Sequence, residues 1–232
     1  MMLPISIRKC GLTLLAGMFA CGVASAAPED KKIYQIRCAA TGIVGGHHIL
    51  WLRTGVGKKP VQVQLNTRVF SAPVKYKGIP VAQFFPTKAA AMAEKPPKPI
   101  AEVKLTGRSV MIVFQPRKDA SGYEVSTTAE KNFPFGSFRV VNFSKDKVRM
   151  DMGDKKRVIP PAKSITYRFL KGNKALPVSI IVRSAKTGKP RYVRRSNWSI
   201  APTQRELVLL LPNPENGLVR AKHFIDSKIE KE

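Results

Sequence analysis

The sequence predicts an all-β protein built from two related antiparallel β-sandwich units, with a short connector rich in alanine and proline at 86–99. Two observations predict this class. Apolar and polar residues alternate in several short segments, which is typical of strands with one buried and one solvated face. Glycine and proline recur between these segments at the spacing expected of turns. Only one short segment, 88–94 (KAAAMAE), has a helical pattern, and the prolines that follow it end the helix.

The first unit is expected over 27–131. Segment 60–65 (PVQVQL) alternates, so Val61, Val63 and Leu65 point to one face and the glutamines to the other. Segment 110–114 (VMIVF) is continuously apolar instead, and its length and flanking turn residues favour a strand buried on both faces over a helix.

The second unit is expected over 132–232. Segment 147–152 (KVRMDM) alternates, and segment 207–211 (LVLLL) is continuously apolar. We match 60–65 with 147–152 and 108–125 with 205–221, because strands, prolines and turns follow in the same order. The spacing between matching positions grows along the chain, which predicts an inserted hairpin at about 186–204.

The N-terminal segment 1–26 reads as a secretory signal peptide. Arg8 and Lys9 precede a short apolar run, which ends at the small-residue cleavage site 24–26. We therefore expect an exported protein, periplasmic or extracellular, with lipidation at Cys21 as the alternative. Cleavage leaves Cys38 as the only thiol, so no internal disulfide is expected, and no later apolar run reaches transmembrane length.

Charge is the strongest compositional signal. The chain holds 41 Lys and Arg against 15 Asp and Glu, a formal net charge of +26. Such a charge attracts polyanions. For an exported protein the expected partners are an anionic glycan, a lipid headgroup or another polyanion, and envelope proteins. The alternative is that the basic side chains only keep the surface solvated.

The segment 183–204 concentrates this charge without any acidic residue. We expect its ligand contacts at seven positions: Lys186, Lys189, Arg191, Tyr192, Arg194, Arg195 and Trp198. Simple alternation puts Tyr192, Arg194 and Trp198 on one face and Arg195 on the other. The alternative is that Tyr192 and Trp198 cap the core while the cations are hydrated.

The search for catalytic motifs predicts no enzyme. The sequence contains no G-x-S-x-G, H-E-x-x-H or Gly-Lys-Ser/Thr motif. A metal site made of His47, His48 and Cys38 lacks carboxylate support, so no metal and no cofactor are expected. A hydrolase in which His223 or His47 meets a carboxylate stays open as an alternative.

The segment 136–169 (GSFRVVNFSKDKVRMDMGDKKRVIPPAKSITYRF) resembles strand pairs of immunoglobulin-like sandwiches and of uncharacterised secreted all-β bacterial proteins. The resemblance implies an immunoglobulin-like fold and transfers no functional residue. The two halves, the export segment and the basic composition also look like periplasmic pilus-type chaperones, in which an exposed strand pairs with a client; 110–114 would be that strand. The sequence thus predicts a non-catalytic envelope or extracellular binding or structural protein, with a strand-adding chaperone or adaptor as the alternative.

Overall fold

The computed structural model describes residues 32–169, 175–183 and 188–228. These residues form four sheets of four strands each, and the only α-helix among them is one short segment. The predicted all-β sandwich architecture is confirmed, whereas the closer likeness to immunoglobulin domains stays a prediction. The expected export segment 1–26 lies outside the described residues.

The first unit contains eight strands. They are β1 (Lys32–Ala40), β2 (Ile49–Leu52), β3 (Val61–Gln64), β4 (Val74–Gly78), β5 (Val81–Phe85), β6 (Ala101–Lys104), β7 (Ser109–Pro116) and β8 (Tyr123–Ala129). One sheet has the order β4-β1-β7-β8 and is called the β1 sheet here; the other has the order β3-β2-β5-β6 and is called the β2 sheet. All pairs are antiparallel except β1 with β7.

The second unit follows a short 3₁₀ helix, η1 (Glu130–Asn132). Its strands are β9 (Ser137–Asn142), β10 (Val148–Met152), β11 (Lys155–Ile159), β12 (Ser164–Arg168), β13 (Leu176–Arg183), β14 (Pro190–Trp198), β15 (Gln204–Pro212) and β16 (Val219–Ser227). The β9 sheet has the order β12-β9-β15-β16, and the β10 sheet has the order β11-β10-β13-β14. The one parallel pair in this unit is β9 with β15.

The strand orders of the two units are the same when β1–β8 are compared with β9–β16. By position in the sheets, β3 therefore matches β11, not the segment 147–152 to which the sequence comparison assigned it. The expected insertion at 186–204 also differs from the structure, because β14 takes the place in the β10 sheet that β6 takes in the β2 sheet. The longer connection lies in the first unit, where α1 (Lys88–Met92) joins β5 to β6.

Each unit encloses its own apolar core. The alternating pattern holds in β3, where Val63 is buried between exposed glutamines, and in β10, where Met150 and Met152 are buried. In the first unit Phe114 packs edge-on against Phe84 and Tyr123, with ring centroids 5.1 and 5.5 Å apart. Burial of these side chains supplies the main stabilisation, since no disulfide joins the described residues.

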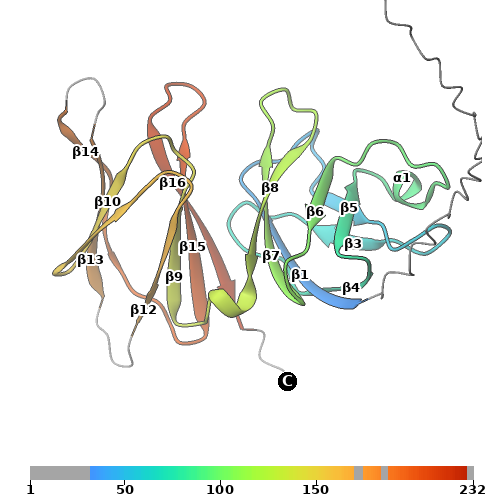
Figure 1. Ribbon diagram of the computed structural model, residues 1–232, viewed down its shortest axis with the longest axis horizontal. Coiled ribbons are helices and arrows are strands. Elements are labelled where there is room, and N and C mark those ends of the chain that lie inside the picture. The colour runs from blue at the N-terminus through green and yellow to red at the C-terminus, as the bar shows by residue number, and fades with distance from the viewer. Residues whose placement is uncertain (1–31, 170–174, 184–187, 229–232) are drawn as a thin grey trace, which may run out of the picture.

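The two units pack against each other through the β1 and β9 sheets, so the molecule has four sheet layers (Figure 1). Apolar side chains from both sheets and from the nearby loops form a third cluster between them: Ala39, Phe70, Met111, Val113, Phe133, Leu207, Leu209, Leu211 and Phe224. The backbone also crosses the interface, because Phe70 N–H donates to Ile225 O at 3.1 Å and Ile225 N–H donates to Arg68 O at 3.0 Å. This second apolar layer explains why β7 and β15 are buried on both faces, as predicted for 110–114 and 207–211.

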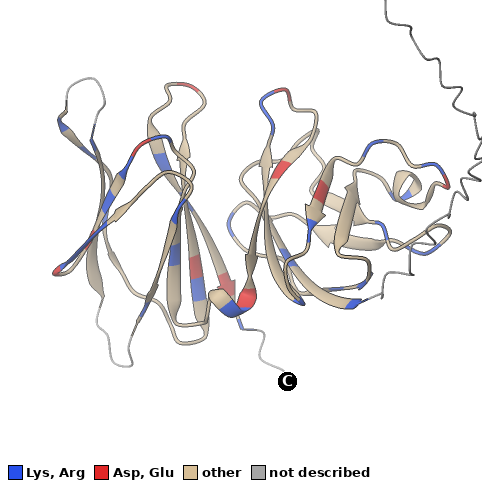
Figure 2. Ribbon diagram, viewed as in Figure 1, with Lys and Arg blue, Asp and Glu red and all other residues tan. Residues whose placement is uncertain are grey.

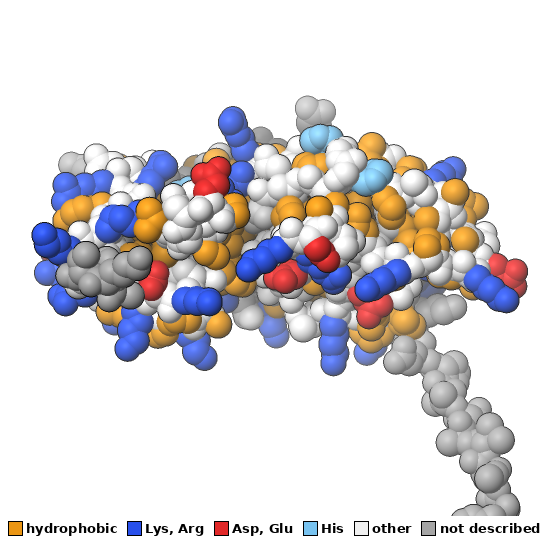
Figure 3. All heavy atoms as spheres, turned by 90° about the horizontal axis from the view of Figure 1, so that it is seen from above, with side chains coloured by type: hydrophobic (Ala, Val, Ile, Leu, Met, Phe, Trp, Pro, Cys, Tyr) orange, Lys and Arg blue, Asp and Glu red, His pale blue; other side chains and the backbone are white. Residues whose placement is uncertain are grey.

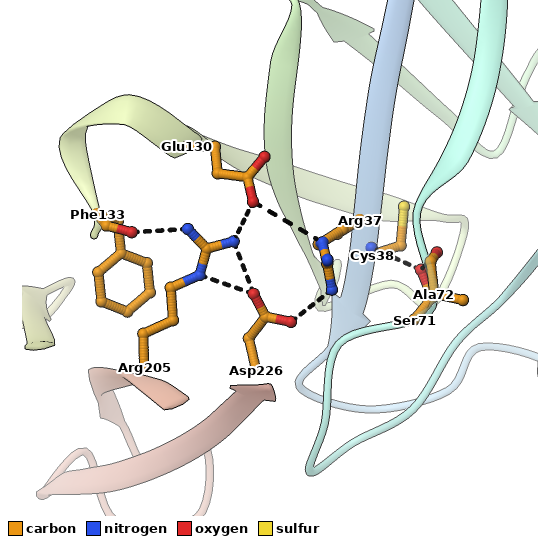
Figure 4. Close-up of polar contacts among 8 residues, drawn as sticks. All are labelled: Arg37, Cys38, Ser71, Ala72, Glu130, Phe133, Arg205 and Asp226. Atoms are coloured by element: carbon orange, nitrogen blue, oxygen red, sulfur yellow. Dashed lines mark hydrogen bonds and ion pairs between the residues drawn. The ribbon is translucent and has the colours of Figure 1, made fainter. Parts of the chain in front are cut away.

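Buried charges complete the interface (Figure 4). Arg205 is 1% exposed, and its Nε donates to Asp226 Oδ2 at 2.7 Å while a terminal nitrogen donates to Phe133 O at 2.7 Å. Asp226 also accepts from Arg37 of β1 at 2.7 Å, and Glu130 pairs with Arg205. Two arginines and two carboxylates therefore compensate one another where the two units meet.

The position of β7 bears on the strand-addition alternative. β7 pairs with β1 on one side and with β8 on the other, so its backbone groups are already bonded. A strand that lends itself to a client must lie at a sheet edge. The expectation that 110–114 is such a strand is wrong, because that segment occupies the middle of the β1 sheet.

Within the described residues, no helix is both long and apolar enough to cross a bilayer. Cys38 is 0% exposed, and burial raises the pKa of its thiol far above the ordinary value. It therefore behaves as a small core residue, as the alternation of its strand indicates.

Tyr123 gives the first core a defined pH dependence. It is 1% exposed, its hydroxyl accepts from Val44 N–H at 2.8 Å, and burial raises its pKa above the ordinary value of about 10. The folded state thus holds the phenolic proton more tightly than the unfolded state. The resulting stabilisation is complete below about pH 10 and is lost as the pH rises through the folded pKa.

We expect Tyr123→Phe to lower the free energy of unfolding by about 1 kcal/mol at pH 7, because Val44 N–H loses its acceptor. This difference should shrink above about pH 10, where wild type loses the contribution of the tyrosine. Urea unfolding of both proteins between pH 7 and pH 11 measures it. A difference that stays constant over this range would contradict the role given to Tyr123.

Candidate anion-binding site

The basic segment singled out in the sequence forms β14, an edge strand of the β10 sheet. It pairs only with β13, and the register shifts between Ile180 and Ile181, whose partners are Arg194 and Tyr192. Val193 is therefore an extra residue, as in a β-bulge. The bulge interrupts the simple alternation that the sequence suggests.

The bulge divides the basic side chains between two surfaces. Arg191 and Arg194 lie opposite Val182 and Ile180, which belong to the core side of β13. Tyr192 lies opposite Ile181 instead, on the outer face of the β10 sheet. Arg194 and Trp198 share a face as expected, since they lie opposite Ile180 and Leu176. The expectation is wrong for Tyr192, because the extra residue at Val193 shifts the alternation and places Tyr192 on the other face, with Arg195.

Trp198 is a core residue. It is 7% exposed, and its ring packs edge-on against Phe138 with centroids 4.8 Å apart and an interplanar angle of 83°. Its Nε1 donates to Ser196 Oγ at 2.7 Å. The ring is covered on this side by the second core, so it does not offer the exposed stacking surface expected from the sequence, and the core-capping alternative describes it better.

Tyr192 does lie at the surface. Its side chain is 48% exposed, and the guanidinium carbon of Arg195 lies 3.8 Å from its ring centroid. This is a close cation–π contact. The pairing of β10 with β11 and β13 places Arg149 and Lys156 on the same outer face, together with Asp151, which pairs with Arg149 at 3.1 Å. Lysine and arginine positions recur along the strands of the second unit (Figure 2).

The inner side of β14 borders a hollow of about 360 Å³ at the edge between β14 and β16, which we call the arginine hollow. Its lining consists of Arg191, Val193, Arg194, Asn213, Asn216, Leu218, Val219, Arg220 and Ala221. No acidic side chain belongs to this lining. Two cations, Arg191 and Arg194, thus lie on the side of the β10 sheet that faces this hollow. Arg220 belongs to the lining, but it lies opposite Leu211, on the face of the β9 sheet that is turned to the first unit.

The cations of the arginine hollow are held by neutral groups. Arg191 donates to Val219 O at 3.1 Å, and Arg194 donates to Ser196 Oγ at 3.3 Å. Within the described part of the chain, neither these two arginines nor Arg220 forms an ion pair with a carboxylate. Among the described residues, no carboxylate therefore compensates their charge.

Two asparagines of the β15–β16 turn contribute further donors. Asn213 Oδ1 accepts from Glu215 N–H at 3.3 Å, and Asn216 Oδ1 accepts from Leu218 N–H at 3.0 Å. In each asparagine the side-chain oxygen accepts a backbone hydrogen bond of the turn, so the side-chain NH₂ group can donate to a ligand. Arginine and amide donors together suit phosphate or carboxylate oxygens.

The positive field extends along β16. The pKa of Lys222 lies below its ordinary value because of burial and because Arg220 and Arg68 repel its charge. Lysine and arginine side chains are also prominent at the end of the molecule formed by the second unit (Figure 3). Arg220 and Lys222 lie opposite Leu211 and Leu209, so this part of the positive field is on the face of the β9 sheet turned to the first unit.

Two predicted contacts remain, Lys189 and Lys186. Lys189 is exposed and lies just before β14. Lys186 lies outside the described residues. Among the seven expected positions, the structure brings Arg191 and Arg194 into the arginine hollow and Tyr192 and Arg195 onto the adjacent outer face.

The histidines are the other candidate site residues. His223 Nδ1 contacts a carboxylate oxygen of Glu206, and the ring packs 5.5 Å from Trp198. The pair lies against the second core and does not line the arginine hollow. His47 and His48 lie in the loop before β2, Cys38 is buried, and the described residues contain no cluster of three metal-ligating side chains.

The sequence reasoning missed Arg220, Asn213 and Asn216. All three lie in segment 212–221 (PNPENGLVRA), which the sequence identifies only as a turn between two strands. Nothing local indicates that this turn lies beside β14, because the contact depends on how the two sheets of the second unit stack.

Comparisons with known proteins give no ligand for the hollow. No protein-family model matches the chain, and no curated protein is significantly similar to it.

Proposed function

We propose that this is an exported, non-catalytic binding protein of the cell envelope or extracellular space that contacts an anionic polymer or surface through the arginine hollow and the adjacent outer face of β14. The observation that carries the proposal is that Arg191 and Arg194 line one hollow and that neither forms an ion pair with a carboxylate among the described residues. Guanidinium groups that have no acidic partner favour bidentate contacts with phosphate or carboxylate.

The adjacent outer face supports an extended ligand. Tyr192 and Arg195 form a half-exposed aromatic and cationic platform on the same strand. A sugar ring or another flat group that lies on this platform would place neighbouring anionic groups near the hollow. Lys189, just before β14, is proposed as a further contact, as is Lys186, which lies outside the described residues.

The overall charge acts at longer range. A net charge of +26 attracts an anionic polymer before specific contacts form, and salt screens this attraction. The hollow and the platform, by contrast, depend on particular side chains. Comparing variants of equal net charge separates the two contributions.

The location is part of the proposal and has its own test. Export requires removal of 1–26, so the exported protein should begin at Ala27. N-terminal sequencing of secreted or periplasmic protein measures this. A mature chain that begins at a lipid-modified Cys21 would favour the lipoprotein alternative, and an intact Met1 would contradict both.

The binding test compares two double variants. We expect Arg191→Ala with Arg194→Ala to weaken binding of polyphosphate or of phosphatidylglycerol vesicles by about tenfold, which corresponds to about 1.4 kcal/mol. The matched control is Lys75→Ala with Lys77→Ala, which removes the same charge from exposed positions on β4 of the first unit. Binding is measured at two salt concentrations, since attraction without defined contacts disappears first.

The control should lower affinity much less than the arginine pair at the higher salt concentration. Equal losses in the two double variants would mean that total charge alone determines binding, and the proposal for the arginine hollow would fail.

A further inference from the structure

A second cavity lies between the two units, and it shares no lining residue with the arginine hollow. It encloses about 180 Å³ where the open edge strand β8 faces β9 and β12. Its floor is apolar and comes from both units: Met111 and Val113 of β7, and Leu207 and Leu209 of β15. We call it the seam cavity.

The rim of the seam cavity is polar. Ser126 and Thr128 of β8 lie directly opposite Val113 and Met111 in the register, on the side of the β1 sheet that faces the second unit. Ser164 of β12 lies on the other side of the rim. Hydroxyl groups therefore border an apolar interior.

Arg139 is the charged group of the seam cavity. It lies on β9, opposite Thr166, and its terminal nitrogens donate to Ser164 Oγ at 2.7 Å, Thr166 Oγ1 at 3.3 Å and Asn132 O at 3.4 Å. Its Nε is buried and has no hydrogen-bond partner among the described residues. No carboxylate of the described chain forms an ion pair with it.

This arrangement contrasts with that of Arg205, the fully buried arginine of the interface. Arg205 is compensated by Asp226 and Glu130, whereas the partly buried Arg139 has only neutral acceptors among the described residues. Burial lowers the pKa of Arg139. A partly buried cation of this kind is stabilised by an anion that reaches it.

The dimensions and lining restrict the anion. An apolar cavity of about 150 Å³ is large enough to bind a benzene ring, so the seam cavity suits a compact ligand with one apolar part and one acidic group. We propose that the seam cavity binds a small amphiphilic carboxylate, with the apolar part against Met111, Val113, Leu207 and Leu209 and the carboxylate on Arg139. This site is separate from the proposed polymer contact.

The test uses three probes of similar size: benzoate, benzyl alcohol and benzylamine. Binding is followed by two-dimensional NMR, through the backbone amides of Ser126 and Thr128 and the Nε–H signal of Arg139. We expect benzoate to shift these signals and to bind at least about tenfold more tightly than the neutral alcohol, since a charged hydrogen bond is lost with the alcohol. Benzylamine should not bind.

Two variants separate the parts of the site. Arg139→Met should lower the affinity for benzoate to that of benzyl alcohol. Thr128→Trp changes an edge-strand position at the rim and should block both ligands without removing the charge. The pair Arg191→Ala and Arg194→Ala should leave benzoate binding unchanged, because it alters only the arginine hollow.

Three results would overturn the proposal. The first is equal affinity for benzoate and benzyl alcohol. The second is benzoate binding that survives Thr128→Trp, which would place the anion outside the cavity. The third is benzoate binding that is lost in the hollow variant and retained in Arg139→Met. Unaltered spectra of the unliganded variants outside the rim confirm that each variant is folded.

Discussion

Replacing Asp226 by alanine should lower the free energy of unfolding by about 3–5 kcal/mol, because removal of one partner leaves a buried arginine uncompensated. Arg205 is 1% exposed and takes its closest ion-pair contacts from Asp226 and Glu130. Asp226 also accepts from Arg37, which belongs to the other unit (Figure 4). Its removal therefore weakens both the second core and the interface.

Asp151→Ala is the matched control for this prediction. Asp151 also pairs with an arginine on a strand, but its partner Arg149 is half exposed, and solvent screens such pairs. We expect a loss of at most about 1 kcal/mol there. Urea unfolding followed by circular dichroism compares the two variants. Similar losses of unfolding free energy in Asp226→Ala and Asp151→Ala would show that the buried charge network stabilises the fold no more than a half-exposed ion pair does.

Phe224→Ala should have an effect of similar size for a different reason. Phe224 is 0% exposed, contacts Phe70 with ring centroids 5.9 Å apart, and belongs to the apolar cluster between the units. Truncation of a buried phenylalanine leaves a cavity and costs about 3–5 kcal/mol. Ile225→Ala, at the neighbouring position on β16 with a side chain 43% exposed, should cost less than about 1 kcal/mol.

The two tryptophans allow the coupling between the units to be measured. Trp51 lies on β2 of the first unit and Trp198 on β14 of the second, and the chain has no other tryptophan. Variants that retain one tryptophan report the unfolding of one unit each. Because Trp198 is a core residue, its replacement changes stability, so each variant is compared with itself. In each variant we expect the urea midpoint from fluorescence to coincide with the midpoint from circular dichroism, which reports both units, and both midpoints to shift in Phe224→Ala. A fluorescence midpoint that differs from the circular dichroism midpoint of the same variant would contradict a single cooperative body.

The rigid interface matters for the seam cavity. Its floor is shared by β7 and β15, so its shape depends on how the two units are held together. The charge network at η1 and the apolar cluster both fix this relation. Phe224→Ala should therefore weaken benzoate binding as well as stability, whereas Ile225→Ala should leave both almost unchanged.

Much of the fold could be predicted from local patterns. Alternation identified β3 and β10, and continuous apolar runs identified β7 and β15, because a strand records which of its faces are covered. The short helix was also expected, and α1 ends at Met92, before the prolines. The continuous apolar runs do not show why β7 and β15 are buried on both faces. The cause is that the other unit packs on the outer side of the sheet.

The candidate sites could be predicted from the sequence only in part. The concentration of cations at 186–195 is a property of the composition, and it pointed to β14 correctly as a basic strand. The prediction for that strand is wrong at Tyr192, which lies on the face of Arg195 and not on that of Arg194, because one unpaired residue at Val193 changes the alternation and nothing in the local sequence marks the bulge.

The all-β class, the buried strands and the strongly basic surface follow from the sequence, because they depend on residue type and short-range periodicity. Which charges lie together follows from the stacking of sheets and the contact between units. Val219 and Ala221 are brought beside Arg191 and Arg194, and among the described residues Arg205 receives two carboxylates whereas Arg139 receives none. These contacts join residues distant in the chain, and their geometry follows from packing that no single segment encodes.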